Sequence, residues 1–310
     1  MRYIGADGVH TALDYEPLIE RLRNAFQDEV NTPSRHHHPI TRSDGPDSML
    51  LLMPAWRKGG KLGVKLVTFF PRNSDQGLAT IQGLYVVFDE TDGTPELVMD
   101  GVALTLRRTS CASALAASYL ARKDASVLIM VGAGALAPHL IRAHCAVRPI
   151  KEILIWNRHI ERALALAKSC QRDGLNATAS DDLESAVRTG DIISCATMSE
   201  KPLVQGRWLK HGCHLDLVGS FKPSMREVDD EAVQRARIFV DTRNGAGTEA
   251  GDLVNPMKRG VIGPDAIIGD LFELTRNSPG RRTKNEITLF KSVGTAIEDL
   301  AAAEMVVERS

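Results

Sequence analysis

The sequence lacks an excess of charge of either sign. Its 38 Lys and Arg residues are balanced by 39 Asp and Glu residues, so the formal net charge of the 310 residues is -1. A nearly neutral chain has no global field that would draw it to nucleic acid or to an anionic membrane. We therefore expect neither as a partner, and we look for recognition at a local site.

Cysteine is scarce and is arranged in no known metal or redox pattern. The five cysteines form no Cys-x-x-Cys pair, and their spacing fits no zinc site. The odd count, with an N-terminal MRYIGADGVH that has no apolar signal core, favours reduced thiols and a cytoplasmic protein. The run His36 to His38 is expected to be a solvated loop, because consecutive side chains point in different directions. No metal is predicted.

Long apolar runs are absent as well. The longest uncharged apolar stretch, residues 125–138, is glycine-rich and shorter than the roughly 20 residues that a membrane-spanning helix needs. Repeats and low-complexity segments are also missing. A content of 43% hydrophobic and 25% charged residues is typical of a soluble globular protein. The length suits one large domain or two ordinary ones.

Two patterns of secondary structure follow one another along the chain. Apolar residues at helical spacing predict a helix over 14–30, and short β-type runs separated by turn formers predict an antiparallel meander over 48–101. From Thr109 a small-residue helix leads into strands that alternate with helices, which predicts a parallel sheet covered on both faces. The expected fold is α/β, a Rossmann-type doubly wound sheet plus a second α+β domain. The amphipathic segment 294–308 is expected to pack on the first domain.

A glycine loop follows the first strand of the alternating part. The stretch MVGAGALAPHL places Gly132, Gly134 and Ala137 at the spacing G-x-G-x-x-A, after an apolar strand and before a helix. The first glycine allows a tight turn, the second lets a pyrophosphate approach the backbone, and the alanine permits close helix packing. The helix N-terminus adds free N–H groups. A packing turn in a flavodoxin-like protein is the alternative, but the context favours a dinucleotide.

The end of the next strand indicates which dinucleotide binds. NAD-binding folds usually carry Asp or Glu there, which binds the ribose 2′-hydroxyl. Here Asn157 takes that place, followed by Arg158, with Arg162 one helical turn further on. Asparagine does not repel a 2′-phosphate, and a guanidinium binds it with two hydrogen bonds. We expect NADPH to be preferred, with NADH possible. A solvated surface arginine is the alternative for Arg158.

Several motifs together resemble the ornithine cyclodeaminase/μ-crystallin family. They include GVKLV, FPRNSDQGLATIQG, LTLRRTSCASALAA, VGAGALA, LDLVGS and EITLFKSVGTAIEDLAAA, and the likeness runs from about residue 30 to the C-terminus. The resemblance implies a substrate-binding and dimerisation domain, residues 1–108 with 294–310, and a dinucleotide-binding domain, residues 109–293. It also implies a homodimer and a small amino or imino acid substrate bound between the two domains.

The resemblance implies that Arg35, Lys65 and Arg108 bind the substrate carboxylate. The chemistry agrees, because two guanidinium groups and an ammonium that converge need an anion. Lys65 lies in the apolar run LGVKLV, where a buried lysine requires a partner or a lowered pKa. We predict Lys65 as the catalytic proton donor, while a substrate already protonated in solution is equally compatible. Each cation alone could instead be an ordinary strand or surface charge.

Three further segments resemble parts of the family that contact the cofactor: CATMS at 195–199, VGS at 218–220 and FKSVG at 290–294. The first two follow strand ends, where doubly wound sheets bind ligands. Cys195 is expected to pack rather than to react, and EAGDL at 249–253 is interpreted as a helix cap. The predicted cofactor-binding residues are Thr109, Gly132, Gly134, Ala135, Leu136, Asn157, Arg158, Ala196, Thr197, Met198, Val218, Ser220 and Ser292.

One departure from the family pattern narrows the activity. Ornithine cyclodeaminases carry an aspartate after VGG, whereas Phe221 follows VGS here, and phenylalanine cannot move a proton. The string LDLVGSFKPSMREVDD resembles the branch that reduces Δ1-pyrroline-2-carboxylate. This implies NAD(P)H-dependent reduction of a cyclic ketimine, of five or six ring atoms, to L-proline or L-pipecolate. The alternatives are ornithine cyclodeaminase or alanine dehydrogenase activity, or a μ-crystallin-like protein that binds NADPH and a ligand.

Overall fold

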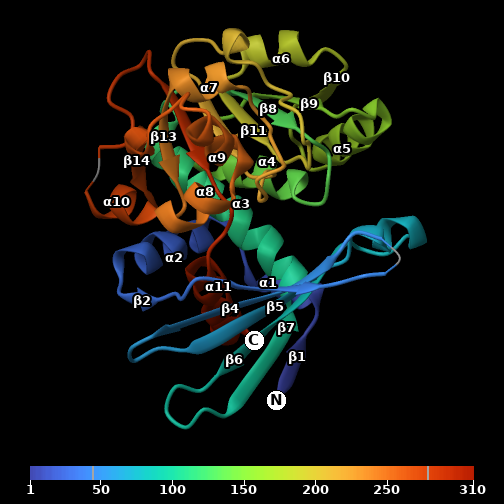
Figure 1. The fold of residues 1–310 in the computed structure, drawn as a ribbon, viewed down its shortest axis with the longest axis vertical. Helices are drawn as coiled ribbons and strands as arrows, with labels where there is room; N and C mark the ends of the chain where they lie inside the picture. The colour runs from blue at the N-terminus through green and yellow to red at the C-terminus, as the bar shows by residue number, and fades with distance from the viewer. Residues whose placement is uncertain (44, 278) are drawn as a thin grey trace. The chain divides into compact units, whose positions relative to one another are not determined.

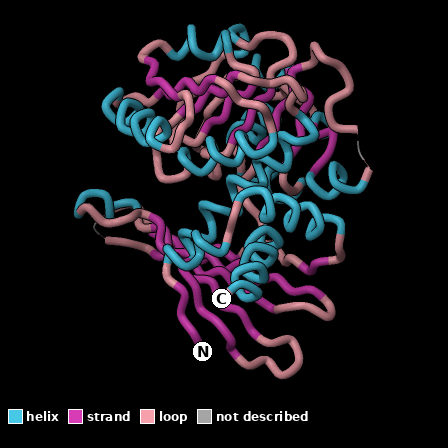
Figure 2. Tube along the Cα trace, turned by 180° about the vertical axis from the view of Figure 1, so that it is seen from behind, coloured by secondary structure: helices cyan, strands magenta, loops and turns pink. Residues whose placement is uncertain are grey.

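The computed structural model describes residues 1–43, 45–277 and 279–310 and divides into two compact units (Figure 1). Unit 1 comprises Met1–Thr109 and Thr295–Ser310, and unit 2 comprises Ser110–Gly294. The division falls inside one long helix, α3 (Gly101–Leu120). The chain begins and ends in unit 1, at a strand and at a helix respectively (Figure 2).

Unit 1 is built on a seven-stranded sheet with the order β1-β7-β6-β5-β4-β2, in which β3 also pairs with β4. The predicted antiparallel meander is present as β4 to β7. The parallel pairing of β1 with β7 was not predicted. The strands are β1 (Arg2–Ile4), β2 (Val30–Asn31), β3 (His36–Ile40), β4 (Ser48–Arg57), β5 (Leu62–Phe69), β6 (Ile81–Phe88) and β7 (Pro95–Asp100).

The three histidines of RHHHP lie in a strand, so the prediction of a loop was wrong. His36, His37 and His38 belong to β3, whose side chains are all exposed. The pairing of β3 with β4 supplies backbone hydrogen bonds that a local pattern of polar residues does not reveal.

One face of this sheet packs against helices. Helix α2 (Tyr15–Gln27) buries an apolar stripe of Leu18, Leu22 and Phe26, and α11 (Ala296–Arg309) contacts α2, β4 and β5. The short α1 (Ala6–Ala12) contacts β7. Because side chains alternate along a strand, every second residue faces these helices. The inward residues include Met53, Ala55, Lys65, Tyr85, Val87, Leu97 and Met99.

Unit 2 contains an eight-stranded sheet in which all neighbouring strands are parallel, with the order β10-β9-β8-β11-β12-β15-β13-β14. Three of these strands, β10, β14 and β15, were not predicted, and β15 lies between β12 and β13. The strands are β8 (Val127–Val131), β9 (Glu152–Trp156), β10 (Ala177–Ser180), β11 (Ile192–Cys195), β12 (His214–Leu217), β13 (Ala236–Val240), β14 (Ile267–Asp270) and β15 (Ile287–Lys291).

Helices cover both faces of the unit 2 sheet, which confirms the doubly wound α/β fold. Leu128 and Met130 pack in one core with α4 and α5, while Ile129 and Val131 pack in the other with α6, α7 and α9. All strands are parallel, so the loops that follow them meet at one edge of the sheet. The helices are α4 (Ala137–Val147), α5 (Ile160–Arg172), α6 (Leu183–Thr189), α7 (Asp230–Arg235), α8 (Arg243–Glu249), α9 (Gly251–Lys258) and α10 (Leu271–Arg276).

Across the described part of the chain, none of the helices has both the length and the apolar character that crossing a membrane requires.

Candidate active site

Lys65 lies on the inner face of β5, and its ammonium group is buried against α11. Its side chain is only 2% exposed, and Nζ lies 2.8 Å from both carboxylate oxygens of Asp299, donating a hydrogen bond to Oδ1. The strand alternation turns Lys65 inward beside Met53 and Tyr85, its partners in the sheet register. A buried ammonium requires a partner of this kind, since burying it unpaired is strongly unfavourable.

Arg108, on α3, binds the same end of α11. Its Nε donates to Asp299 Oδ1 over 2.9 Å, and its Nη1 donates to Glu298 Oε2 over 2.6 Å. Glu298 and Asp299 lie in the first turn of α11, where negative side chains also favour the helix dipole. Both carboxylates are fully buried. Asp299 is therefore shared by two of the three cations that the sequence predicts for substrate binding.

The third predicted cation, Arg35, precedes β3 and is half-buried. Its charge acts on both Lys65 and Asp299 and lowers the pKa of each. We call these five residues, Arg35, Lys65, Arg108, Glu298 and Asp299, the cationic cluster. Three cations against two carboxylates leave one positive charge in excess. This balance suits a ligand with a single carboxylate.

Burial and neighbouring charges tune the proton affinity of the cluster. Burial, followed by the charge of Arg108, lowers the pKa of Lys65 from 10.5 to about 8, although Asp299 opposes the shift. Burial alone would raise the pKa of Asp299, but the charges of Arg108 and Lys65 outweigh it and hold that pKa below its usual value. Burial also keeps the pKa of Tyr85 well above 10. Lys65 is therefore the group of this cluster suited to releasing a proton near neutral pH.

In unit 2 the two glycines of the loop differ in backbone conformation and in the space around them. Gly132 has a φ of 110°, in the region that favours glycine, and a Cβ there would lie 2.7 Å from the Ala196 carbonyl oxygen. A Cβ on Gly134 would meet no atom within 4 Å. Gly134 and Ala135 are exposed just before α4 begins, and Leu136 is its N-cap. The backbone at Gly134 is thus open to a phosphate group beside a helix N-terminus.

Asn157 fastens the end of β9 to the glycine loop. Its Oδ1 accepts a hydrogen bond from the Ala133 N–H over 3.3 Å, and its Nδ2 donates to the His159 carbonyl over 3.0 Å. The neighbouring Arg158 is exposed and forms no ion pair with any residue that the structure describes. No carboxylate stands at this strand end, so a negatively charged group beside Arg158 would meet attraction rather than repulsion.

Two further predicted segments lie side by side at the carboxyl edge of the sheet. Ala196, Thr197 and Met198 follow β11, and the segment 218–220 follows the adjacent strand β12. A Cβ on Gly219 would lie 1.9 Å from the Thr197 carbonyl oxygen, so the two loops are in direct contact. Met198 is 62% exposed, whereas Val218 and Ser220 are buried.

Ser292 and Thr109 are buried rather than displayed on a loop surface. Ser292 donates through Oγ to Asp241 Oδ2 over 3.2 Å and through its N–H to the Leu217 carbonyl over 3.1 Å. Thr109 lies inside α3 and ends the first segment of unit 1. Their role toward a cofactor stays a prediction.

Glu227 was not predicted, and Asp252 has another role than the one predicted. Both are fully buried, and Asp252 Oδ1 accepts hydrogen bonds from the N–H groups of Glu227 and Val228 over 2.7 and 3.1 Å. The interpretation of EAGDL as a helix cap is wrong, because α9 begins after Ala250 with no side-chain cap. Acids within a polar string such as MREVDD look like solvated surface charges. The one available signal was the nearby Gly219, which permits close packing of the loops.

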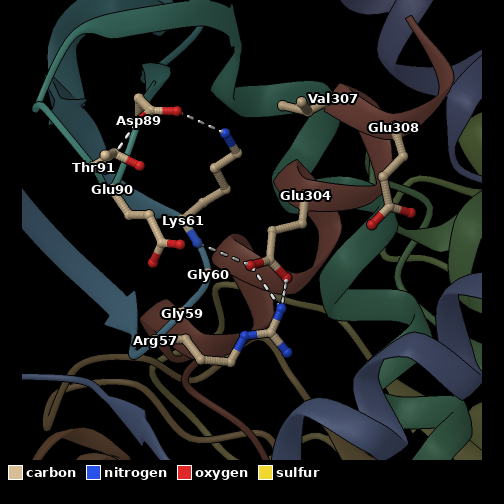
Figure 3. A pocket seen from close by; sticks show the side chains of 10 residues that line it. All are labelled: Arg57, Gly59, Gly60, Lys61, Asp89, Glu90, Thr91, Glu304, Val307 and Glu308. Atoms are coloured by element: carbon tan, nitrogen blue, oxygen red, sulfur yellow. Dashed lines mark hydrogen bonds and ion pairs between the residues drawn. The ribbon is translucent and has the colours of Figure 1, made fainter.

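A separate hollow of about 260 Å³ in unit 1 is lined by charged side chains, several of which pair with one another (Figure 3). Arg57 Nη2 lies 2.9 Å from both carboxylate oxygens of Glu304, and Lys61 Nζ lies 2.8 Å from Glu96 and 3.5 Å from Asp89. The Arg57–Glu304 pair fastens α11 to the end of β4, and the Lys61 pairs join the turn after β4 to β7 and the turn before it. We therefore give this hollow a structural role.

Among the residues that the structure describes, no group of three metal-binding side chains comes together.

Comparison with known proteins places the chain in a family. The Ornithine cyclodeaminase/mu-crystallin family profile matches residues 7–310. The chain is 44% identical over 318 residues to Protein SAR DEFICIENT 4 of Arabidopsis thaliana, covering 99% of this chain and 96% of that protein. It is 36% identical over 317 residues to a Delta(1)-pyrroline-2-carboxylate reductase of Colwellia psychrerythraea, covering 100% and 99%.

A comparison with a solved structure indicates the same family. The Thermococcus litoralis Delta(1)-pyrroline-2-carboxylate reductase, in complex with NADH and L-proline, superposes with a TM-score of 0.95 at 31% identity, covering 100% of this chain and 97% of that one. The predicted family is thereby confirmed: the chain belongs to the ornithine cyclodeaminase/mu-crystallin family.

Proposed function

We propose that this protein reduces Δ1-pyrroline-2-carboxylate to L-proline with a reduced nicotinamide dinucleotide. The observation that carries the proposal is the cationic cluster, which has one positive charge in excess and holds a lysine whose pKa is about 8. The substrate is a carboxylate and an imine, so it needs one anchoring charge and one proton. The Thermococcus litoralis reductase, in complex with NADH and L-proline, supports the same reading.

In the proposed reaction Arg35 and Arg108 bind the substrate carboxylate, and Lys65 gives its proton to the imine nitrogen. When bound, the nicotinamide supplies a hydride to the imine carbon. The C=N bond thus becomes a CH–NH bond, and the neutral Lys65 regains a proton from solvent. Asp299 keeps the ammonium of Lys65 oriented through the 2.8 Å hydrogen bond. Its lowered pKa keeps Asp299 ionised as the counter-ion throughout.

Phe221 favours a substrate whose ring is already closed. It stands where the family's ornithine cyclodeaminases have an aspartate, and the Lys222 ammonium lies 5.8 Å from its ring centre. An aromatic ring excludes water but moves no proton, so activation of a free amine lacks its acid–base group. The retained cationic cluster also argues for turnover rather than for ligand binding alone, because a mere ligand carrier need not keep a carboxylate clamp.

The residues of the glycine loop fit a dinucleotide. Gly134 leaves open space where the pyrophosphate is expected, just before the N-terminus of α4. Arg158 is exposed next to Asn157, and no carboxylate is there to take the ribose 2′-hydroxyl. On this basis we propose NADPH as the preferred cofactor, with NADH as a weaker substitute.

The proposal is tested by mixing the purified protein with each cyclic ketimine and each cofactor and following oxidation of the reduced nicotinamide. We expect reduction of both the five- and the six-membered ring, because one methylene is worth only about 1–3 kcal/mol of discrimination. NADPH should give a kcat/KM about tenfold or more above that of NADH. A clear preference for NADH contradicts the argument from Arg158.

Controls with other substrates separate the alternatives. Turnover of L-ornithine or L-alanine at a comparable kcat/KM would replace the proposed reaction by a cyclodeaminase or dehydrogenase activity. Tight NADPH binding with no reduction of either ketimine would favour a ligand-binding protein.

We also propose that the protein is a homodimer, joined through the face of the unit 1 sheet that points away from its helices. The sheet register aligns Pro54, Val64, Val86 and Val98 on this face, and all four are partly exposed. The same face carries Trp56 and Leu84, 39% and 42% exposed. A contiguous apolar patch of this kind is typical of an association surface.

Val64→Glu is expected to convert the dimer into a monomer, because it places a charge in the middle of the apolar face. The measurement is the molar mass by light scattering over a range of concentrations. Lys58→Glu, on the exposed turn after β4, is the matched control and should leave the mass unchanged. A wild-type protein that is monomeric at all concentrations would rule the dimer out.

A further inference from the structure

Glu227 is fully buried and joins two loops through its two carboxylate oxygens. Oε1 accepts hydrogen bonds from the N–H and the hydroxyl of Thr197, over 2.7 and 3.0 Å. Oε2 accepts from the N–H groups of Gly219 and Ser220, over 2.8 and 3.3 Å. Each oxygen thus serves a different loop, one after β11 and the other after β12.

Glu227 is itself fixed by a second buried carboxylate and a buried lysine. Asp252 Oδ1 accepts the N–H of Glu227 over 2.7 Å. Lys291 Nζ, at the end of β15, lies 3.6 Å from Asp252 Oδ2 and 3.9 Å from Glu227 Oε2. All three side chains are fully buried, so the lysine offsets part of the cost of burying two negative charges.

The contact between the loops leaves no room for a side chain at Gly219. A Cβ on Gly219 would lie 1.9 Å from the Thr197 carbonyl oxygen and 2.5 Å from Glu227 Oε1. The carboxylate therefore binds both loops at a point where their backbones already touch. These loops carry five of the predicted cofactor-binding residues: Ala196, Thr197, Met198, Val218 and Ser220.

We propose that Glu227 is a positioning residue for the nicotinamide cofactor. Its carboxylate holds the loops after β11 and β12 in the one arrangement that the cofactor binds, and so sets cofactor affinity without touching the reacting atoms. The proposal rests on the proposed function, because only there are these loops assigned to the cofactor. It extends that function to a buried side chain that is not itself a cofactor contact.

Glu227→Gln tests the proposal with little change of shape. A carboxylate accepts at both oxygens, but a carboxamide must turn its NH2 group toward one of the two sets of N–H donors. Either Thr197 or the Gly219–Ser220 pair then faces a donor instead of an acceptor. One loop is released, and the buried N–H group loses its partner.

For Glu227→Gln we expect the Kd for NADPH, measured by nicotinamide fluorescence, to rise about tenfold or more. The KM for the ketimine should change less than about twofold, because the cationic cluster belongs to unit 1. In the cofactor-free protein, hydrogen exchange should quicken at the amides of Thr197, Gly219 and Ser220. Where Glu227→Gln does not fold, Asp252→Ala, which removes the acceptor of the Glu227 and Val228 N–H groups and keeps the Glu227 carboxylate, should raise the Kd in the same direction.

Asp191→Asn is the matched control. Asp191 also binds backbone amides, those of Ser126 and Val127 over 2.8 and 3.0 Å, but it precedes β11 and lies at the opposite edge of the sheet. It should lower thermal stability and leave the NADPH Kd unchanged.

The outcomes separate the two proposals. An unchanged Kd and unchanged exchange in Glu227→Gln overturn the positioning role, as does an equal rise in Kd in Asp191→Asn. A wild-type protein that binds neither NADPH nor NADH overturns the proposed function. In that case faster exchange at the three amides still supports Glu227 as the residue that holds the loops, and unchanged exchange overturns it.

Discussion

Lys65→Met is expected to lower kcat/KM for Δ1-pyrroline-2-carboxylate by about 10²- to 10⁴-fold. Methionine is of similar length and fills the same inward position on β5, but it supplies neither a charge nor a proton. Steady-state kinetics with saturating NADPH measure the effect. Lys61→Met is the control, because Lys61 lies in the turn directly before β5 and pairs with Glu96 outside the cationic cluster. Its kcat/KM should stay within about twofold of the wild type.

The two kinetic constants separate two roles of Lys65. A proton donor acts in the transition state, so its loss lowers kcat. A carboxylate anchor acts equally on the bound substrate, so its loss raises KM alone. We expect both to change, since the pKa of about 8 and the excess positive charge of the cluster serve both roles. A nearly unchanged kcat with a raised KM would leave Lys65 as an anchor only, with the proton entering on the substrate.

The pH dependence provides an independent check of Lys65. If its protonated form reacts, kcat/KM falls as the pH rises through about 8, the pKa that burial and Arg108 set. Lys65→Arg should remove this loss with rising pH but keep kcat low, because a guanidinium stays charged and releases no proton. The free energy of unfolding depends on pH in the opposite direction to kcat/KM. The folded pKa lies below the unfolded value of 10.5, so the unfolded chain binds more protons between pH 8 and 10.5 and unfolding becomes less favourable as the pH rises there.

The sequence predicts the cations of the cationic cluster but not their carboxylate partners. The apolar run around Lys65 and the alternation of a strand foretell a buried lysine, and the family motifs point to Arg108. The counter-ion could not be foretold, because Asp299 is 234 residues away from Lys65 along the chain. Locally, acids in AIEDLAAAE suggest the solvent face of an amphipathic helix. They are buried because α11 packs on β4 and β5, and only the tertiary fold creates that contact.

The same limit applies in unit 2. Strands with strong apolar character, such as β8, are predicted because periodicity is a local property. The strand β10 is missed because its sequence, ATAS, is short and polar and takes its hydrogen bonds from β9. The place of β15 between β12 and β13 is missed because strand order is a property of crossovers. Glu227 is missed because two of its partners, Thr197 and Gly219, belong to loops that only the sheet brings together.

Two substitutions in the glycine loop distinguish a packing turn from a cofactor site. Gly132→Ala should destabilise the protein by about 2 kcal/mol or more, because it adds a left-handed φ for alanine and a clash with the Ala196 carbonyl. Gly134→Ala should change the free energy of unfolding by less than about 0.5 kcal/mol, since its Cβ would meet no atom within 4 Å.

The affinity for the cofactor should change in the opposite order, more in Gly134→Ala than in Gly132→Ala. A methyl group on Gly134 occupies the space through which the pyrophosphate approaches the backbone, so the Kd for NADPH should rise about tenfold or more in a protein of normal stability. Chemical denaturation and fluorescence titration of the same samples measure the two quantities. If Gly134→Ala binds NADPH as the wild type does, the open space beside Gly134 is only the outside of a turn, and the loop has no part in holding the cofactor.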